Sequence, residues 1–377
     1  MKKLENYQII IIGAGLSGLT LAKEICARSN YKILILEKKK KLVYDKNWCF
    51  WNQPINTFTH NFDNAWEKIS VSIDDKEKIF FDKKIKYLHI KSTTFYKKFI
   101  NDLKKKNVKI KMNQNINEIL YENNWKLVKS NNSIFKSKIV FDSRPQKYSN
   151  KKNLLYQHFY GVEILLENSL LDKNKVTLMD FQTFNNGIHF FYVLPFSAKK
   201  ALVETTYFST NVLEESIYKS DIRKYLKKKF PNEKYKIKFK EKGIIPMFHD
   251  YNNNIKNDLI NIGTRGNWVR ASTGYSFQNS FLNAKEITEK LIHRKKLNIS
   301  ANKKIRFLDK IFCYYIANYS NDSKEFFKCF FFKNKFRNIV SFLIGDINLL
   351  RMLVIILSLP KKKLLYSMFK TIIHNKK

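Results

Sequence analysis

Residues 7–37 read YQIIIIGAGLSGLTLAKEICARSNYKILILE, and this stretch decides the fold of the chain. The apolar run 7–12 is typical of a buried parallel strand, residues 16–27 have helical periodicity, and residues 32–36 form a second apolar run. A strand, a glycine-rich turn, a helix and a second strand predict a Rossmann-type βαβ unit. We therefore expect an α/β protein that binds a dinucleotide.

The turn itself is the motif Gly13-Ala14-Gly15-Leu16-Ser17-Gly18. Gly13 permits a tight turn, Gly15 lets the backbone approach a pyrophosphate, and Gly18 allows the helix to pack closely on the strand. Phosphates would bind at the helix N-terminus, where N–H groups and the helix dipole favour anions. Glu37 ends the second strand and is placed to accept hydrogen bonds from ribose hydroxyls. The motif residues and Glu37 are therefore candidate cofactor-binding residues.

A second glycine-rich segment favours FAD over NAD, which the first motif alone does not separate. Residues 262–266, IGTRG, follow an apolar run, and residues 272–276, STGYS, lead into a helix predicted over 277–295. Many flavoproteins contact the ribityl chain and the pyrimidine edge of the flavin in this way, and the helix N-terminus would stabilise negative charge on the reduced ring. The candidate flavin-binding residues of this segment are Gly263, Gly266, Thr273 and Gly274.

The middle of the chain is rich in β-strand patterns. Apolar runs separated by turn residues predict antiparallel strands at 156–165, 176–181, 188–194 and 201–207. The fold class is therefore a glutathione-reductase-like, Rossmann-type FAD-binding domain interleaved with an antiparallel-sheet substrate domain and followed by a helical C-terminal region. The expected boundaries are 1–150 for the first part of the FAD-binding domain, 151–250 for the substrate domain, 251–300 for the return to the FAD-binding domain, and 301–377 for the helical, basic region.

The composition bears on partners and compartment. There are 71 basic and 32 acidic residues, which gives a net charge of +39. Such a charge favours binding to nucleic acid or to an anionic membrane surface. Most of the excess is Lys scattered in runs such as 38–41 and 361–363, which favours compositional drift, with membrane attraction as the alternative. No nucleic-acid-binding motif is found, so nucleic acid is not expected as a partner.

The cysteines and the apolar runs bear on metal binding and on the membrane. The four cysteines lie far apart, without metal or redox spacing, so we expect no metal site and a reduced, cytoplasmic compartment. No signal peptide is expected, because the first apolar run leads directly into the glycine motif. No run reaches the ~18 apolar residues needed to span a bilayer, and residues 338–360 are interrupted by charges.

Further segments occur in a fixed order behind the glycine motif. They are WCFW (48–51), YQHFYG (156–161), LMDF (178–181), FFYVLP (190–195), LVETT (202–206), GIIPM (243–247) and STGYSF (272–277). With the glycine motif, they make the chain resemble the bacterial lycopene cyclases of the carotenoid pathway over roughly residues 7–360. The departures from the family pattern are Pro145 in place of a common Gly, Arg265 in place of the first of two paired glycines, and Gln182 in place of a frequent Arg.

The resemblance implies an isomerase that closes the linear ends of lycopene into β-rings, giving β-carotene by way of γ-carotene. Reduced FAD would take part without net redox change, and NADPH would be the reductant. It implies that Glu204 is the acid/base, although reduced flavin could donate the proton instead. Asp180 is a second carboxylate that either assists catalysis or serves as a structural hydrogen-bond acceptor.

Residue chemistry agrees with this implied reaction. Glu204 lies in an apolar run, and burial raises the pKa of a carboxyl group and keeps it protonated. Aromatic side chains could line a polyene path and stabilise a cation, and the candidates are Trp48, Phe50, Trp51, Phe190 and Tyr192.

The C-terminal region bears on where such an enzyme would work. Residues 326–333 and 349–359 combine apolar faces with basic edges, typical either of helices lying on a membrane or of a buried helical cap. We expect a peripheral position on the cytoplasmic side of a bacterial membrane. The alternatives for the whole chain are an FAD-dependent monooxygenase or desaturase acting on an apolar isoprenoid, and a basic binding protein with a vestigial nucleotide fold.

Overall fold

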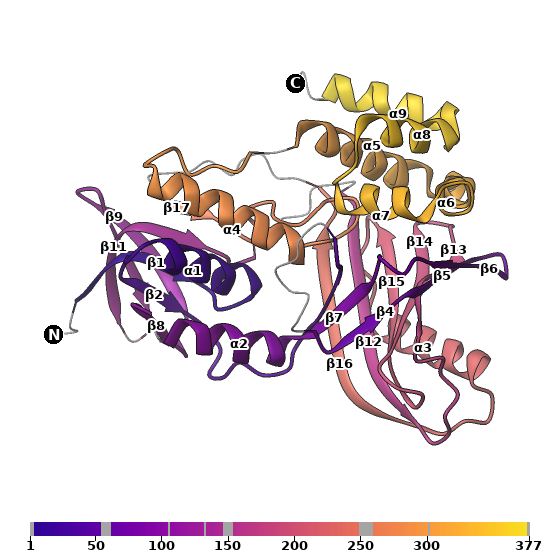
Figure 1. The fold of residues 1–377 in the computed structure, drawn as a ribbon, viewed down its shortest axis with the longest axis horizontal. Helices are drawn as coiled ribbons and strands as arrows, with labels where there is room; N and C mark the ends of the chain where they lie inside the picture. The colour runs from indigo at the N-terminus through magenta and orange to yellow at the C-terminus, as the bar shows by residue number, and fades with distance from the viewer. Residues whose placement is uncertain are drawn as a thin grey trace.

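The protein is described here by a computed structural model covering residues 4–53, 62–104, 106–131, 133–145, 154–248, 259–300 and 302–374. Two large sheets lie next to each other, and a layer of helices lies over one end of the second sheet (Figure 1). The chain passes from the first sheet to the second and back before it reaches the helical layer. The predicted interleaving of the two sheet regions is thus confirmed.

The first sheet contains the predicted βαβ unit. Strand β1 (Glu5–Ile12) has four consecutive buried isoleucines and pairs in parallel with β2 (Ile33–Leu36) and β11 (Ile134–Asp142). Helix α1 (Leu16–Arg28) connects β1 to β2. The other strands of this sheet are β8 (Val108–Lys111), β9 (Ile116–Glu122), β10 (Trp125–Ser130) and β17 (Leu259–Asn261).

Helices α1, α2 (Ser92–Lys104) and α4 (Phe277–Ile292) share one hydrophobic core with the first sheet. Strand β17 pairs in parallel with the end of β11, so the chain re-enters the first sheet after the second sheet is complete. Because β17 leads to α4, the second glycine-rich segment lies between two elements of this domain. It is thereby brought to the edge of the sheet at which β1 ends.

The second sheet holds the four predicted antiparallel strands and one long strand beside them. Its order is β16-β12-β15-β14-β13-β5-β6, and helix α3 (Glu215–Lys229) packs on one face. Its strands are β16 (Tyr235–Pro246), β12 (Tyr156–Leu166), β15 (Lys200–Ser209), β14 (Ile188–Pro195), β13 (Lys175–Thr183), β5 (Lys68–Ile73) and β6 (Lys76–Phe81).

Strands β5 and β6 belong to the second sheet, although they lie within the range predicted for the first part of the FAD-binding domain. Strand β5 pairs in parallel with β13, which is about 100 residues later in the chain. Alternation of apolar residues identifies a strand but not its partner. A small third sheet of β3 (Asn47–Trp51), β7 (Tyr87–Lys91) and β4 (Asn64–Trp66) joins the two regions.

The C-terminal region is helical, as predicted. Asn302 and Asn348 cap α5 and α8 through their side-chain oxygens, and Gly345 ends α7 with a φ of 78°. The helices are α5 (Lys303–Tyr319), α6 (Ser323–Phe332), α7 (Phe336–Ile344), α8 (Leu349–Ser358) and α9 (Lys361–His374). In the described part of the chain, no single helix is long and apolar enough to span a membrane. Helices α7 and α8, taken together, have sufficient length and apolarity, but the pair is bent by 107°.

Candidate functional site

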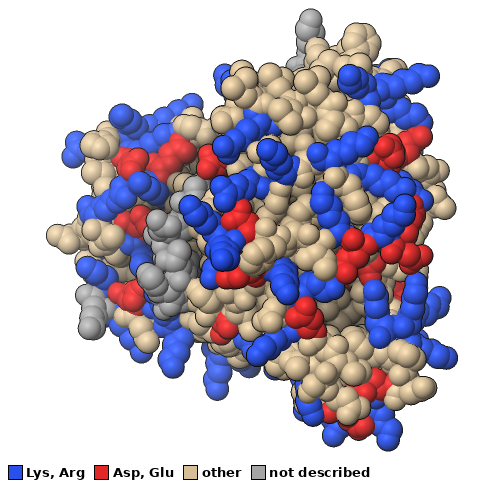
Figure 2. All heavy atoms as spheres, turned by 45° about the vertical axis from the view of Figure 1, so that its right-hand side comes forward, with Lys and Arg blue, Asp and Glu red and all other residues tan. Residues whose placement is uncertain are grey.

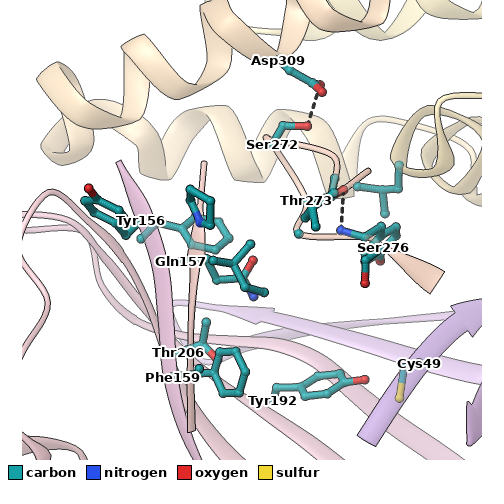
Figure 3. Close-up of a pocket in the computed structure, with 18 of the residues that line it drawn as sticks. Cys49, Tyr156, Gln157, Phe159, Tyr192, Thr206, Ser272, Thr273, Ser276 and Asp309 are labelled. Atoms are coloured by element: carbon teal, nitrogen blue, oxygen red, sulfur yellow. Dashed lines mark hydrogen bonds between the residues drawn. The ribbon is translucent and has the colours of Figure 1, made fainter. Parts of the chain in front are cut away.

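A cavity of about 1370 Å³ lies between the glycine-rich loops, the second sheet and the C-terminal helices. Its volume exceeds the ~300–1000 Å³ that is usual for pockets that bind a single small ligand. Figure 3 shows side chains of the sheet, among them Phe159 and Tyr192, on one side and the 272–276 loop on the other. The cavity can therefore hold a long ligand that runs from the first domain to the helical layer.

The glycine motif forms one end of this cavity, where Gly15, Leu16 and Ser17 line the wall. A Cβ atom on Gly15 would meet no described atom within 4 Å apart from its chain neighbours, whereas one on Gly18 would lie 2.0 Å from the Gly13 oxygen. Gly13 itself has a φ of 101°. Helix α1 begins without a side-chain cap, so its N-terminus is suited to an anion. This geometry fits a pyrophosphate.

Glu37 supports the glycine motif from the end of β2. Its carboxylate oxygens accept hydrogen bonds from the backbone N–H groups of Ala14, at 2.7 Å, and Lys39, at 2.9 Å. Glu37 is buried and, among the described residues, is not one that lines the cavity. The bond to Ala14 fixes the turn, and a contact of Glu37 with a ribose stays a prediction.

The second glycine loop packs directly against the first. Gly263 has a φ of 65°, and a Cβ atom on it would lie 3.1 Å from the Ser17 hydroxyl oxygen. Gly274 has a φ of 70°, and a Cβ atom there would lie 2.5 Å from a glutamine oxygen on β12. Gly263, Thr273 and Gly274 line the cavity, whereas a Cβ atom on Gly266 would clash with the backbone at the end of β17. Gly266 therefore serves the turn.

Asp142 connects both loops at the end of β11, through two basic residues. The Arg144 guanidinium donates to it from Nε at 3.0 Å and Nη2 at 2.8 Å, and Arg265 Nη1 lies 3.4 Å away. Asp142 is fully buried, so this pairing compensates its charge. Arg265, which departs from the family pattern, thus joins the second loop to the first sheet, and Pro145 lines the cavity.

A buried ion pair not predicted from the sequence fixes the second loop to the helical layer. Arg270 and Asp309 are 5% and 2% exposed and lie 3.0 Å apart. The Ser272 hydroxyl donates to the same carboxylate at 2.7 Å (Figure 3). The partners are 39 positions apart in the sequence, and no spacing rule connects them. Helix α5 thereby holds the second glycine loop in place.

Strand β15 sends every second side chain into the cavity. Leu202, Glu204, Thr206 and Phe208 all line it, as the period of a strand requires. Glu204 is buried, and the Thr206 hydroxyl donates to its carboxyl group at 2.7 Å. Burial and, to a lesser extent, the Glu241 carboxylate raise the pKa of Glu204 to about 8. Glu204 is therefore protonated at neutral pH and can donate a proton.

Glu241 of β16 is a second carboxyl group that lines the cavity, and it was not predicted from the sequence. The backbone N–H and the side-chain amide of Asn47 donate to it at 3.2 and 2.8 Å. Burial raises the pKa of Glu241 to about 7, although these bonds act in the opposite direction. Lys240 and Lys242 flank Glu241, a pattern typical of an exposed strand. The one available signal was the GIIPM segment directly behind it.

Asp180 lies on the opposite face of the same sheet. It pairs with Phe191 on β14, and the Tyr225 hydroxyl of α3 donates to its carboxylate at 2.9 Å. Lys229 Nζ lies 3.2 Å from the same oxygen. Asp180 is not among the described residues that line the cavity. This placement favours the structural alternative for Asp180 over an assisting role in catalysis.

The predicted aromatic wall divides into two groups. Trp48, Phe190 and Tyr192 line the cavity, and the Tyr192 hydroxyl donates to that of Tyr87 at 3.1 Å. Phe50 and Trp51 are not among the described lining residues: Phe50 stacks on Phe277, at 4.1 Å between ring centroids, and the Trp51 indole N–H donates to Tyr275 at 3.3 Å. These two rings thus contact residues that line the cavity, Phe277 and Tyr275, without lining it themselves.

The helical layer closes the far end of the cavity. Four phenylalanines of α6 are buried and line it, namely Phe326, Phe327, Phe330 and Phe331. Residues 326–333 are therefore the buried cap, which was one of the two readings of that segment. By contrast, α8 and α9 expose large apolar side chains, the most exposed being Leu350, Leu357 and Phe369.

Among the described residues, no group of three or more His, Cys, Asp or Glu side chains is placed to hold a metal ion. The basic side chains are spread over the face shown in Figure 2, with acidic side chains among them. On that face the basic side chains are not gathered into a single groove.

Comparison with known proteins identifies the family. Residues 8–368 match the family model described as lycopene cyclase protein. The chain belongs to the lycopene cyclase family. It is 24% identical over 291 residues to capsanthin/capsorubin synthase of Citrus sinensis, and 23% identical over 322 residues to neoxanthin synthase of Solanum lycopersicum. These matches cover 72% and 76% of this chain but only 57% and 61% of the two plant proteins.

Solved structures confirm the flavoprotein fold of this lycopene cyclase family member. A geranylgeranyl bacteriochlorophyll reductase-like protein from Thermoplasma acidophilum aligns over 98% of this chain and 100% of its own, with a TM-score of 0.65 and 13% identity. A flavoprotein/dehydrogenase from Cytophaga hutchinsonii aligns over 90% and 93%, with a TM-score of 0.63 and 13% identity. The halogenase PltM in complex with phloroglucinol and FAD aligns over 89% and 78%, with a TM-score of 0.57 and 13% identity.

Proposed function

We propose that this protein closes the linear ends of lycopene into β-rings, forming β-carotene by way of γ-carotene, with reduced FAD bound and no net redox change. The observation that carries the proposal is Glu204, an acid protonated at neutral pH on the wall of a long, largely apolar cavity. The same cavity reaches the N-terminus of α1, where the cofactor phosphates would bind. The reaction class is therefore an isomerisation (intramolecular lyase).

Glu204 starts the ring closure in this proposal. Its carboxyl group donates a proton to the terminal double bond, and the next double bond attacks the resulting carbocation to close the ring. Loss of a ring proton to the carboxylate restores the acid, so protons and electrons balance. Trp48, Phe190 and Tyr192 line the cavity, and their rings would stabilise positive charge there.

The residues that would hold FAD are the two glycine loops. The open space over Gly15, the uncapped start of α1, and the contact of Gly263 with Ser17 fit a dinucleotide pyrophosphate. When bound in its reduced form, FAD supplies a negative charge near the ring-closing cation, and NADPH is the proposed reductant. Thr273 and Gly274 lie on the loop before α4, whose N-terminus faces the same end of the cavity.

A peripheral position on the cytoplasmic face of a bacterial membrane would deliver the substrate. Leu350 and Leu357 of α8 are 76% and 64% exposed, and Phe369 of α9 is 59% exposed. Leu365 is both exposed and part of the cavity wall, so the cavity opens at this apolar face. Basic residues edge the face, including Arg351 and Lys361–Lys363, and would favour anionic lipids.

Expression in a lycopene-accumulating bacterium tests the proposed function. Pigment analysis is expected to show γ-carotene and β-carotene in place of lycopene. Unchanged lycopene beside folded, flavin-loaded protein would rule the proposal out. Vesicle flotation of the same protein, with anionic and neutral lipids compared, tests the peripheral position separately.

A flavin-dependent monooxygenase or desaturase acting on an apolar isoprenoid is the second candidate, because the fold is shared with a reductase-like protein and a halogenase. Such an enzyme would consume a reductant or oxidant in proportion to product. NADPH consumption measured against pigment formed separates the two candidates.

A further inference from the structure

Glu204 and Glu241 are brought together by a glycine between them. Strand β12 lies between β15 and β16, and its Gly161 is the register partner of Glu204 on one side and of Glu241 on the other. The three residues therefore form one row across the sheet. Because side chains in such a row point to the same face, both carboxyl groups lie on the cavity side of Gly161.

The two glutamates use the space that Gly161 leaves. A Cβ atom on Gly161 would lie 3.3 Å from Glu241 Cγ, 3.3 Å from Leu202 Cδ1 and 3.6 Å from Glu204 Cβ. The two glutamate side chains thus flank the space over the glycine from the two neighbouring strands, and the Leu202 side chain packs against the same space. Glycine is needed here for the close approach of its neighbours, since its φ is not positive.

The surroundings of the two carboxyl groups differ. Glu241 accepts two N–H bonds from Asn47, and N–H donors favour the ionised form of a carboxyl group. Glu204 receives one bond, from the Thr206 hydroxyl, and is buried, whereas Glu241 is partly exposed. The pair is therefore polarised toward a charged Glu241 and a neutral Glu204.

Other groups that face the pair keep this polarity. Burial raises the pKa of Cys49, Tyr192 and Tyr44, so these side chains stay neutral at physiological pH. Lys46 lies near Glu241 and favours its charge, while Asp45 acts in the opposite direction. Two further titratable residues line the cavity beside these groups: Tyr87 is bonded to Tyr192, and Lys242 is paired with Glu215.

We propose that Glu241 is a positioning residue: its ionised carboxylate, held by Asn47 and lying across Gly161 from Glu204, keeps the proton on Glu204. The inference rests on the proposed function of Glu204 as the acid. Two carboxylates in one row of the sheet, facing the same apolar cavity, resist being charged together, so the one stabilised by N–H donors takes the charge and the other retains the proton. Glu241 needs no contact with substrate to do this.

Infrared titration of the protonated carboxyl band tests the pair without relying on activity. In Glu241→Gln, we expect the Glu204 titration midpoint to fall by roughly one pH unit or more, because the like charge is removed. In the pH profile of cyclisation, the loss of activity at alkaline pH should shift to lower pH by a similar amount. Glu241→Asp restores the charge and should return the midpoint toward that of the wild type. The matched control is Glu215→Gln, an exposed glutamate paired with Lys242, which should leave the midpoint unchanged.

Gly161→Ala is the second variant, and it keeps both carboxyl groups. The added methyl group must push the neighbouring side chains apart, so the midpoint should fall, but by less than in Glu241→Gln. An unchanged midpoint in folded Glu241→Gln would overturn the inference. Absence of cyclisation in the wild type would overturn the proposed function instead, while leaving the infrared result for the pair intact.

Discussion

The two glycine loops and the cavity face of the second sheet meet at one cavity but are built in different ways. In the loops, backbone geometry decides: Gly13, Gly263 and Gly274 have positive φ, and Gly15 leaves open space. On the sheet, the alternation of side chains decides, since Glu204 lines the cavity while its neighbour Thr205 does not and bonds to His189 instead. The comparison teaches that cofactor binding and acid chemistry can be removed separately, by different kinds of substitution.

Glu204→Gln is expected to have the largest effect, on the sheet side of the comparison. An amide cannot donate the proton, so cyclisation should fall by at least ~100-fold, the usual contribution of a general acid. Flavin content should not change, because Glu204 lies on β15 and not on the glycine loops that would hold the cofactor, and the amide keeps nearly the same volume. Pigment chromatography and flavin absorbance measure the two outcomes. Full activity in this variant would remove Glu204 from its role.

Gly15→Val is the corresponding change in the loops. Its side chain would occupy the open space expected to hold the pyrophosphate, so the purified protein should lose its flavin while staying folded. Gly18→Ala is the matched control, since its Cβ atom would lie 2.0 Å from a backbone oxygen and should lower the melting temperature instead. A flavin-loaded Gly15→Val protein would contradict the placement of the cofactor.

The double variant Leu350→Glu/Leu357→Glu tests whether the exposed face beside the cavity mouth binds lipid. Replacing two exposed apolar side chains with charges should weaken binding to anionic vesicles by at least ~10-fold. Ile217→Glu is the matched control, because Ile217 is exposed on α3, away from this face. Equal loss in both variants would mean that the α8 face is not the binding surface.

The pH dependence of the melting temperature tests whether Glu204 is buried and protonated in the folded protein. Burial holds the pKa of Glu204 at about 8, above the ~4.3 of an unfolded chain, so the folded state binds the extra proton. Glu204 should therefore destabilise the protein progressively as pH rises from that lower value toward about 8. Glu204→Gln should melt a few degrees above the wild type at alkaline pH and close to it near pH 5. A constant difference across this range would contradict a buried, titrating Glu204.

The smallest effect is expected for Asp180→Asn, on the α3 face. The substitution weakens the contacts with Tyr225 and Lys229, at a cost of about 1 kcal/mol. Cyclisation at a permissive temperature should stay within about twofold of the wild type. Loss comparable to that of Glu204→Gln would restore Asp180 as a catalytic residue.

Sequence reasoning reached the features that short-range patterns encode. The βαβ unit, both glycine loops and the apolar setting of Glu204 all depend on residues close together in the chain, and each was located correctly. The flavoprotein fold followed from their order. Strand alternation also identified β12 to β15 as strands.

Features that depend on long-range pairing were not predicted. Glu241 lies beside Glu204 only because β12 separates β15 from β16, and Arg270 meets Asp309 only when α5 packs on the loop. Asp180 and Glu204 were both predicted to lie on strands, with the role of Asp180 left open, and the sheet register decided that only Glu204 of the two faces the cavity. The burial of α6 and the exposure of α8 likewise depend on helix packing, since both segments are similarly amphipathic.

Ring closure in deuterated water tests the central claim most directly. Wild-type protein with lycopene-containing vesicles and reduced FAD would be incubated without oxygen, and the pigment analysed by mass spectrometry while flavin absorbance is followed. An acid-initiated isomerisation predicts that each new ring carries solvent deuterium and that the flavin stays reduced. Rings formed without deuterium, or flavin oxidised in proportion to product, would contradict it.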